Sequence, residues 1–376
     1  MKIFKEFPGQ LPEFKYLNGI ESPKDLKLLE EGELVELANE LREFLLHSVS
    51  KTGGHFGAGL GTIELTIALH YVLDMPFDKI VWDTGHQAYP HKILTGRREK
   101  MHLMRKKDGI HPFPSITESE YDAMSVGHSS TSISASLGMN EANVHLSTKR
   151  NIFSVIGDGA MTAGIAFEGM MHAAHLNNNL NIVLNDNDMS ISKNTGGLSD
   201  YLAKVWASKS YKKLKSSGKK VLKNLPGGLH ISRNLKDGLK HAVMPGNLFE
   251  DLGLHYIGPI DGHDIPLLIK TLRRMVEKKE PYILHIITKK GAGFEPAENE
   301  RIKYHAISKI ENTPAVKQAR FQDIFGDWLC YKASLDNKLI GITPAMKEGS
   351  GMVDFEKQYP DRFYDVAIAE QHSVTF

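Results

Sequence analysis

At 376 residues, with 41% hydrophobic and 24% charged residues, the chain is long enough for two or three domains with cores of their own. Its formal net charge of +1 excludes a global attraction to nucleic acid or a membrane surface, and no apolar run approaches the ~18 residues of a membrane span. A single cysteine, Cys330, excludes a disulfide within the chain, and the N-terminus lacks the apolar stretch of a signal peptide, so we expect a cytoplasmic protein.

The first predicted elements are helices around a glycine-rich loop. After Ser22-Pro23, leucines recur at helical spacing up to about residue 50, and the glycines of 51–61 follow. A helix is predicted over 62–74 and a short buried strand over 79–83. Strands and helices then alternate, with strands expected at 151–156, 181–185, 254–260 and 281–288 and helices at 132–146, 166–175 and 265–279. This alternation predicts an α/β fold, a mainly parallel sheet covered by helices on both faces.

Two segments break the alternation. Residues 200–245 are rich in lysine, which fits a solvated, mobile excursion better than a basic patch for nucleic acid. Residues 290–318 are rich in glycine, proline and charge, as linkers between domains are. We therefore divide the chain into a first domain, 1–315, and the opening part of a second α/β domain, 316–376, with strands expected at 339–343 and 365–369.

Polar residues follow two of the predicted strands. Gly157-Asp158-Gly159 comes directly after one strand, and Asn185-Asp186-Asn187 after the next. In parallel sheets, neighbouring strands deliver their carboxyl ends to the same edge, so Asp158 and Asn187 should lie side by side. A carboxylate and an amide oxygen suit Mg²⁺, which leaves its remaining positions to phosphate oxygens and water. The glycines allow backbone amides to approach an anion.

The competing interpretation of Gly-Asp-Gly alone is a simple turn, but the helix, second strand and Asn-Asp-Asn that follow favour a metal site. The chain has neither a G-x-x-x-x-G-K-[ST] loop nor, at this position, the G-x-G-x-x-G of dinucleotide-binding proteins. Further candidates for anion binding stand at other strand-to-helix junctions: His86, the run 127–129, and Lys289 with Lys290. Any single histidine is more often a structural hydrogen-bonding group; the repeated position at strand ends is what suggests function.

Taken together, these residues resemble the thiamine-diphosphate enzymes of the transketolase type, and most closely the 1-deoxy-D-xylulose-5-phosphate synthase family. The resemblance is carried, in the family's order and over nearly the whole chain, by "KTGGHFGAGLG", "VWDTGHQAYPHKILTGRR", "GHSSTSISASLGM", "VIGDGAMTAG", "LNDNDMSIS", "IGPIDGHD", "TKKGAGFEPAE", "GDWL", "ITPAMKEGSG" and "AEQHSVTF". It implies thiamine diphosphate and Mg²⁺ as cofactors, and the condensation of pyruvate with D-glyceraldehyde 3-phosphate, with release of CO₂, to 1-deoxy-D-xylulose 5-phosphate.

The resemblance also implies roles for particular residues. Asp158, Asn187 and the backbone carbonyl of Met189 would hold Mg²⁺ on the diphosphate. The cofactor would be surrounded by His86, Gly127, His128, Ser129, Gly159, Ala160, Asn187, Lys289 and Phe294, the last at a position where the family usually has tyrosine. His55 and His305 would face the substrates, and Glu370 would be the acid that hydrogen-bonds the aminopyrimidine ring.

The chain departs from the family in length, because the family continues through the rest of a pyrimidine-binding domain and a third domain. The resemblance therefore implies a fragment that is inactive alone and, in the whole enzyme, a homodimer. Two alternatives stay open: a transketolase-type transfer of ketol groups between sugar phosphates, and a non-catalytic module for cofactor binding or dimerisation.

Overall fold

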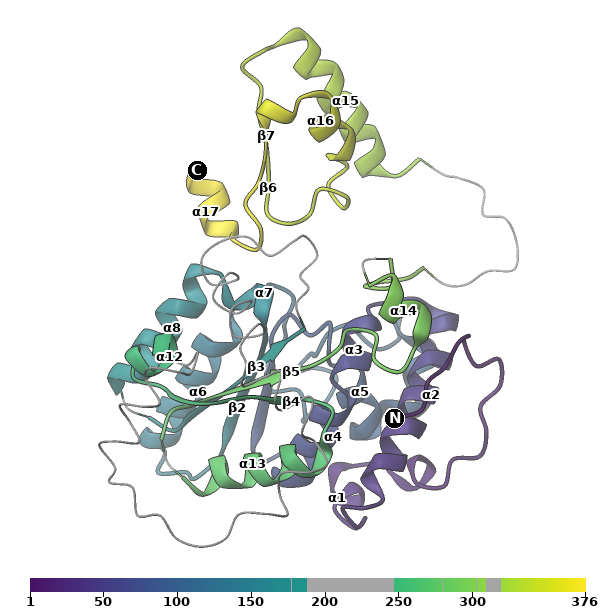
Figure 1. Ribbon diagram of the computed structural model, residues 1–376, viewed down its shortest axis with the longest axis vertical. Helices are drawn as coiled ribbons and strands as arrows, with labels where there is room; N and C mark the ends of the chain where they lie inside the picture. The colour runs from purple at the N-terminus through teal and green to yellow at the C-terminus, as the bar shows by residue number, and fades with distance from the viewer. Residues whose placement is uncertain (177, 188–246, 279, 302, 309–318) are drawn as a thin grey trace, which may run out of the picture.

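The computed structural model describes residues 1–176, 178–187, 247–278, 280–301, 303–308 and 319–376, so Met189 and most of the lysine-rich segment lie outside it. Its larger part is built on a five-stranded parallel sheet with the strand order β1-β2-β3-β5-β4 (Figure 1). The strands are β1 (Lys79–Trp82), β2 (Ile152–Gly157), β3 (Leu180–Asp186), β4 (His255–Asp261) and β5 (Tyr282–Ile287).

Helices cover both faces of this sheet, as the alternating pattern predicts (Figure 1). One face packs against α6 (Ser132–His145), α8 (Gly164–Leu176) and α12 (Asn247–Asp251), and the other against α2 (Leu34–Thr52), α4 (Ile63–Val72) and α13 (Ile265–Glu277). Successive residues of the central strands feed the two cores in turn: Val155 and Val183 join the α4 and α13 side, and Ile156 joins the α6 and α8 side. Because both faces are buried, β2 and β3 are apolar along most of their length.

Short helices connect these layers. They are η1 (Leu17–Gly19), α1 (Pro23–Leu26), α3 (Gly57–Gly61), α5 (Tyr89–Lys92), η2 (Ile93–Arg97), η3 (Arg98–Leu103), α7 (Asp158–Met161) and α14 (Glu295–Asn299). The helical backbone after β2 begins at Asp158 itself, in the short helix α7, ahead of the helix predicted at 166–175. Among the described residues, no helix is both long and apolar enough to cross a membrane.

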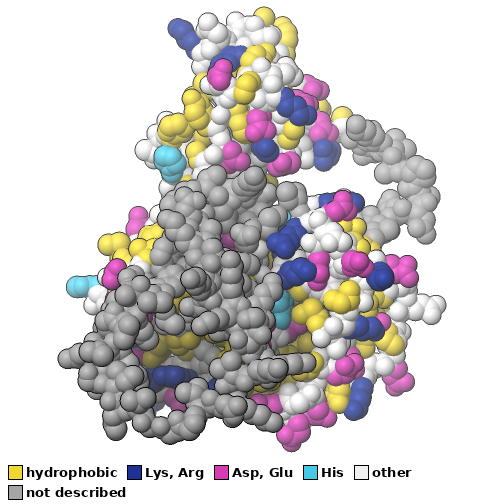
Figure 2. All heavy atoms as spheres, in the orientation of Figure 1, with side chains coloured by type: hydrophobic (Ala, Val, Ile, Leu, Met, Phe, Trp, Pro, Cys, Tyr) yellow, Lys and Arg dark blue, Asp and Glu magenta, His cyan; other side chains and the backbone are white. Residues whose placement is uncertain are grey.

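Residues 321–376 form a smaller unit with a core of its own around Leu329, Ala333, Met352 and Phe355. Its elements are α15 (Phe321–Leu335), β6 (Gly341–Thr343), α16 (Val353–Gln358), η5 (Pro360–Arg362), β7 (Phe363–Asp365) and α17 (Glu370–Thr375), with β6 and β7 paired in parallel. Figure 2 shows hydrophobic side chains on the surface of this unit, where Phe321 of α15 is 93% exposed.

The prediction of a strand at 365–369 is wrong. The strand β7 ends at Asp365, and Glu370 begins the helix α17 instead of standing at a strand tip. The carboxylate of Asp365 accepts hydrogen bonds from the backbone N–H groups of Ala345 at 2.9 Å and Ala367 at 3.0 Å. These bonds turn the chain, and Ala367 takes a left-handed backbone conformation with φ 58° that a continuing strand excludes.

Candidate functional site

A pocket of about 320 Å³ opens at the carboxyl ends of the strands, with walls from both the large sheet and the small unit. In the parallel pairing of β2 with β3, Gly157 stands opposite Asn185. Asp158 and Asn187 therefore leave neighbouring strand ends at the same edge, and both line the pocket. This juxtaposition is the one that the Gly-Asp-Gly and Asn-Asp-Asn motifs predict.

Most of the residues singled out in the sequence meet in this one pocket. Those that line it are His55, His86, Gly127, His128, Ser129, Asp158, Gly159, Ala160, Asn187, His305 and Glu370. The structure thus brings together side chains that lie more than 300 residues apart in the chain, while their chemical roles stay predictions.

Two of the singled-out residues, Lys289 and Phe294, do not line the pocket. The side chain of Lys289 is 45% exposed and pairs with Glu298. Phe294 is 1% exposed and packs its ring 4.6 Å from that of Phe7, inside the main core. Met189 lies outside the described residues. Phe294 can therefore support the site only through packing.

The neighbouring lysine, Lys290, lines the pocket in place of Lys289. It is 4% exposed, and burial lowers its pKa to about 8, although the nearby carboxylate of Asp158 acts in the opposite direction. At pH 7 the amine is still mostly protonated, so it presents a buried cation to the pocket. Two adjacent lysines in the sequence predict a cation here without telling which of them turns inward.

Other residues line the pocket that no motif in the sequence singles out. Thr84 and Gln87 come from the segment that contains His86, and Pro344, Ala345, Met346 and Ile368 come from the small unit. Most of them lie within "VWDTGHQAYPHK" and "ITPAMKEGSG", which were recognised as segments without roles for these positions. Phe113 belongs to no recognised segment, and only the fold brings its ring to 5.8 Å from the ring of His55.

Three histidines gather on one side of the pocket. The ring centroids of His55 and His305 are 5.2 Å apart, and that of His86 lies 6.4 Å from His55 and 6.0 Å from His305. Burial lowers the pKa of His55 to about 4, of His86 to about 3 and of His305 to about 2, with nearby positive charges, including Lys290, adding to the effect. All three are therefore neutral at pH 7, so each carries one ring N–H donor and one acceptor nitrogen.

We expect the free energy of unfolding to fall as the pH drops below about 6.5. The unfolded chain takes up protons near the ordinary pKa of 6.5, whereas folded His55, His86 and His305 resist protonation down to about 4, 3 and 2. The stabilising contribution is complete above 6.5 and is lost toward these lower values, by up to ~1.4 kcal/mol per pH unit for each histidine. Urea unfolding of His55→Asn should give a shallower slope between about pH 7.5 and 5. Equal slopes for wild type and His55→Asn would contradict the expectation.

The side chain of Asp83, at the end of β1, holds the turn that presents residues 127–129. Its buried carboxylate accepts the backbone N–H of Ser130 at 2.8 Å and of Ser132 at 3.1 Å. Burial raises the pKa of Asp83, although these hydrogen bonds oppose the shift. Ser130 has a left-handed backbone, φ 71°, as do the pocket residues Thr84 and Ala345, both at φ 59°. Non-glycine residues in this conformation are typical of functional sites whose surroundings enforce them.

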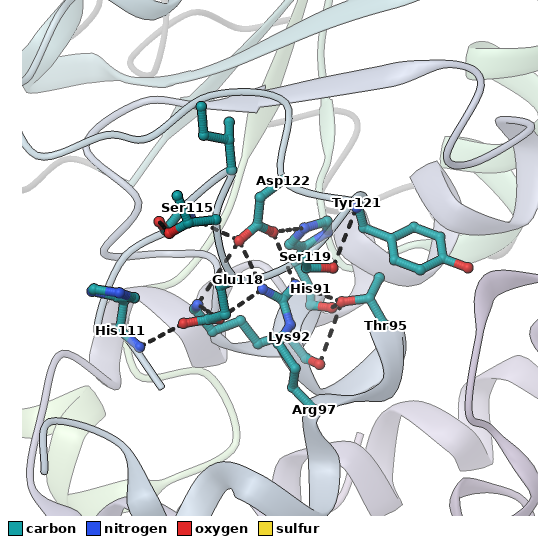
Figure 3. A network of polar contacts seen from close by, with 12 residues as sticks. His91, Lys92, Thr95, Arg97, His111, Ser115, Glu118, Ser119, Tyr121 and Asp122 are labelled. Atoms are coloured by element: carbon teal, nitrogen blue, oxygen red, sulfur yellow. Dashed lines mark hydrogen bonds and ion pairs between the residues drawn. The ribbon is translucent and has the colours of Figure 1, made fainter. Parts of the chain in front are cut away.

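A buried polar network is centred on Asp122 (Figure 3). The carboxylate of Asp122 accepts from both terminal nitrogens of Arg97, at 2.7 and 2.9 Å, and from the backbone N–H of Ser115 at 2.8 Å. It also lies 3.0 Å from Nε2 of His91. Burial alone would raise the pKa of Asp122, but the hydrogen bonds and charges of His91 and Arg97 hold it well below its usual range.

This network fixes the loop that runs from 111 to 122, and the loop carries Phe113 to the pocket. The carbonyl of Pro114 accepts from the N–H of Val126 at 3.2 Å, immediately before Gly127. A Cβ built at Gly85, beside His86, would come within 2.4 Å of Pro114. The loop therefore packs against the segment that contains His86 and against the segment that leads to Gly127, so a shift of the loop would move both.

Glu370 approaches the pocket from the small unit. Its Oε1 accepts from the hydroxyl of Ser129 at 3.3 Å and lies 3.9 Å from Nε2 of His128. Among the described residues, its Oε2 is buried without a hydrogen-bond partner. A carboxylate with one oxygen held and the other unpaired, facing a pocket, is prepared to hydrogen-bond a ligand.

Further buried polar atoms of the pocket likewise have no hydrogen-bond partner among the described residues. Nδ1 of His55, Nδ1 of His305 and Oδ1 of Asn187 are buried, and within the described part of the chain no group hydrogen-bonds them. A Cβ built at Gly127 or Gly157 meets no atom within 4 Å, so the space beside both is open. Buried polar atoms are rarely left unpaired, so this donor and acceptor set fits a polar, phosphate-bearing ligand and a hard cation.

Comparison with known proteins agrees with this geometry. Residues 17–288 match the family model described as 1-deoxy-D-xylulose-5-phosphate synthase. Curated proteins of that name from Pseudomonas entomophila (strain L48) and Stutzerimonas stutzeri (strain A1501) are 56% and 57% identical to this chain, over 99% and 100% of its length. The chain spans about 60% of the length of these relatives.

Solved structures with a similar fold include transketolases. The transketolase from Leishmania mexicana aligns with 88% of this chain and 48% of its own, with a TM-score of 0.50 and 15% identity. A transketolase from Pichia stipitis in complex with sedoheptulose 7-phosphate gives a TM-score of 0.50 and 14% identity over 88% of this chain and 47% of its own. At such identity the likeness concerns the fold alone.

Proposed function

The chain belongs to the 1-deoxy-D-xylulose-5-phosphate synthase family, and from this premise we propose that the full-length protein condenses pyruvate with D-glyceraldehyde 3-phosphate. The products are CO₂ and 1-deoxy-D-xylulose 5-phosphate. The observation that carries the proposal is the single pocket shared by Asp158, Asn187, the three histidines and Glu370. When bound, thiamine diphosphate supplies the electron sink that decarboxylation and carbon–carbon bond formation require.

The diphosphate end of the cofactor would lie at the tips of β2 and β3. Asp158 and Asn187 would offer one carboxylate and one amide oxygen to Mg²⁺, and Met189 stays the proposed source of a third, backbone ligand. The described residues contain no cluster of three or more His, Cys, Asp or Glu that would hold a metal by themselves. Mg²⁺ takes few protein ligands and fills its remaining positions with phosphate oxygens and water. Lys290 would add a positive charge on the anion.

The other pocket residues would act on protons and on substrate position. Glu370 would hold the aminopyrimidine end of the cofactor through the Oε2 atom that is unpaired within the described residues. His55 and His305 are neutral at pH 7, so each can orient a substrate through one ring N–H donor and one acceptor nitrogen. The ring of Phe113 beside His55 would exclude water from this part of the pocket.

The first test of this proposal is removal of the proposed magnesium ligand. We expect Asp158→Ala to weaken binding of thiamine diphosphate by about 10- to 100-fold in calorimetric titrations with Mg²⁺. The wild-type affinity should fall to a similar level when Mg²⁺ is left out, because the diphosphate charges then lack their counter-ion. Asp327→Ala, which removes an exposed carboxylate of α15, serves as the matched control and should bind as wild type does. Unchanged Mg²⁺-dependent binding by Asp158→Ala would refute the assignment.

The second test concerns the reaction. The full-length protein should release CO₂ from pyruvate in the presence of D-glyceraldehyde 3-phosphate, whereas transfer from xylulose 5-phosphate without pyruvate would identify a transketolase instead. Cofactor binding without either activity would favour a non-catalytic module. We further propose that residues 1–376 alone do not turn over, because the residues that complete the pyrimidine and triose-phosphate sites are expected in the part of the relatives beyond the matched 60%.

We also propose a cytoplasmic homodimer with no nucleic-acid partner. The net charge of +1 argues against a nucleic-acid partner, and the single cysteine fits a reducing cytoplasm. The homodimer is supported by the large exposed side chains of α15, among them Phe321 and Trp328. Light scattering of the full-length protein at micromolar concentration would decide the oligomeric state.

A further inference from the structure

The segment 288–293 carries Lys290 into the pocket, and side chains outside the pocket hold its backbone. The N–H of Lys289 donates to Nε2 of His263 at 2.9 Å. The carbonyl of Ala292 accepts from Nε of Arg42 at 2.9 Å. The pocket lysine thus stands between two backbone groups that are fixed from another side of the fold.

The two holding side chains meet at one carboxylate. Nδ1 of His263 lies 3.0 Å from Oε2 of Glu64, and a terminal nitrogen of Arg42 pairs with Oε1 of the same carboxylate. The side chains of Arg42 and Glu64 are only 0% and 5% exposed. Burial alone would raise the pKa of Glu64, but the hydrogen bond from His263 and the charge of Arg42 lower it. Glu64 is therefore an ionised, buried anchor.

These contacts determine the tautomer of His263. A backbone N–H can only donate, so Nε2, which receives the N–H of Lys289, must carry no proton. The proton of the neutral ring is then on Nδ1 and donates to Glu64. His263 itself does not line the pocket; it stands after β4, beside the loop that does.

We propose that His263, Glu64 and Arg42 form a relay that positions Lys290, so that His263 is a positioning residue for the anion-binding end of the pocket. That Lys290 meets a diphosphate rests on the proposed function; that the relay places its amine does not. Lys289 precedes Lys290 in the chain. Within the described structure, Nε2 of His263 is the only side-chain acceptor for the backbone N–H of Lys289. Loss of that acceptor lets the loop move, and the amine moves with it.

Two variants of His263 test whether the ring positions the loop or only fills space, because each keeps a different one of its two hydrogen bonds. A glutamine amide reaches about as far as Nε2 and can still accept the N–H of Lys289, whereas an asparagine amide reaches only as far as Nδ1 and keeps at most the contact with Glu64. We therefore expect His263→Gln to behave like wild type and His263→Asn to release the loop.

The readout is the rate at which an amine-acylating reagent modifies Lys290 in the full-length protein, followed by peptide mass spectrometry. The exposed Lys357 of α16 is the internal control, since its side chain is 68% accessible and lies outside the loop, whereas Lys290 is 4% exposed. We expect acylation of Lys290 to become about tenfold faster in His263→Asn, with the rate at Lys357 unchanged, and the affinity for thiamine diphosphate to fall about tenfold. Equal Lys290 rates in wild type and His263→Asn would overturn the proposal, and so would a His263→Gln protein as reactive as His263→Asn.

If His263→Asn does not fold, nitrogen NMR of wild-type His263 still decides the matter. A protonated Nε2 would contradict the relay, and an unprotonated Nε2 with a protonated Nδ1 would support it. None of these measurements needs pyruvate or product. A protein that forms no 1-deoxy-D-xylulose 5-phosphate would count against the proposed function, while the acylation and NMR results would still judge the relay.

Discussion

Glu370→Gln is expected to lower the turnover number by about 10²- to 10⁴-fold while leaving the affinity for thiamine diphosphate within a few-fold of wild type. The substitution keeps the size of the side chain and its contact with Ser129, 3.3 Å away, but removes the charge and the ability to take up a proton. The proposed anchors of the diphosphate, Asp158 and Asn187, directly follow the strands β2 and β3 and are untouched. Binding and turnover should therefore separate cleanly in this variant.

The measurement is product formation from pyruvate and D-glyceraldehyde 3-phosphate, with calorimetry for the cofactor. Glu348→Gln offers a control on the same unit, because Glu348 is exposed and lies outside the lining of the pocket. A Glu370→Gln enzyme with near-normal turnover would exclude the role proposed for this acid. Loss of cofactor binding together with activity would show that the carboxylate serves mainly to hold the cofactor.

Asp122→Asn is expected to lower the free energy of unfolding by about 3–5 kcal/mol. The carboxylate of Asp122 offsets the buried charge of Arg97, which is 4% exposed, and accepts hydrogen bonds from Arg97 and Ser115 (Figure 3). An asparagine in its place brings an N–H₂ group toward donors and leaves the guanidinium with too little negative charge around it. The cost comes from the uncompensated charge, and it exceeds what an ordinary surface ion pair contributes.

Chemical unfolding in urea measures this effect, and Glu120→Gln is its control, because Glu120 is exposed and only two residues away. A change below ~1 kcal/mol in Asp122→Asn would place the network among weak surface ion pairs and contradict its structural role. Because the loop 111–122 presents Phe113 to the pocket, the variant should also bind thiamine diphosphate less tightly at temperatures where it remains folded.

The sheet was largely predictable because its residues obey local rules. Apolar runs between turn residues marked β2, β3 and β5, and parallel pairing then placed Asp158 beside Asn187 without further information. The error at 365–369 has the opposite origin. The consecutive apolar residues 366–369 predict a strand, but the carboxylate of Asp365 reaches the N–H of Ala345, twenty residues earlier, and turns the chain. Such a contact depends on tertiary structure, and no local pattern contains it.

The site was predictable to the extent that its residues belong to recognisable segments. His86, Ser129 and Glu370 stand in such segments, and all three line the pocket. The inward lysine was not predictable, since only the fold of 288–293 decides between Lys289 and Lys290. The network around Asp122 could not be predicted from the sequence either. Arg97 and Asp122 lie 25 residues apart, and only the fold buries both and brings them into contact.

The pocket has one wall on the large sheet and another, with Ala345, Ile368 and Glu370, on the small unit. A ligand that touches both walls is thermodynamically linked to their association: the factor by which it tightens docking of the two units equals the factor by which docking tightens its own binding. The cofactor would then stabilise the docking of the small unit on the large sheet in addition to its chemical role. A substitution on the outer surface that merely loosens the small unit would raise the concentration of thiamine diphosphate needed for half-saturation, without any change in the pocket itself.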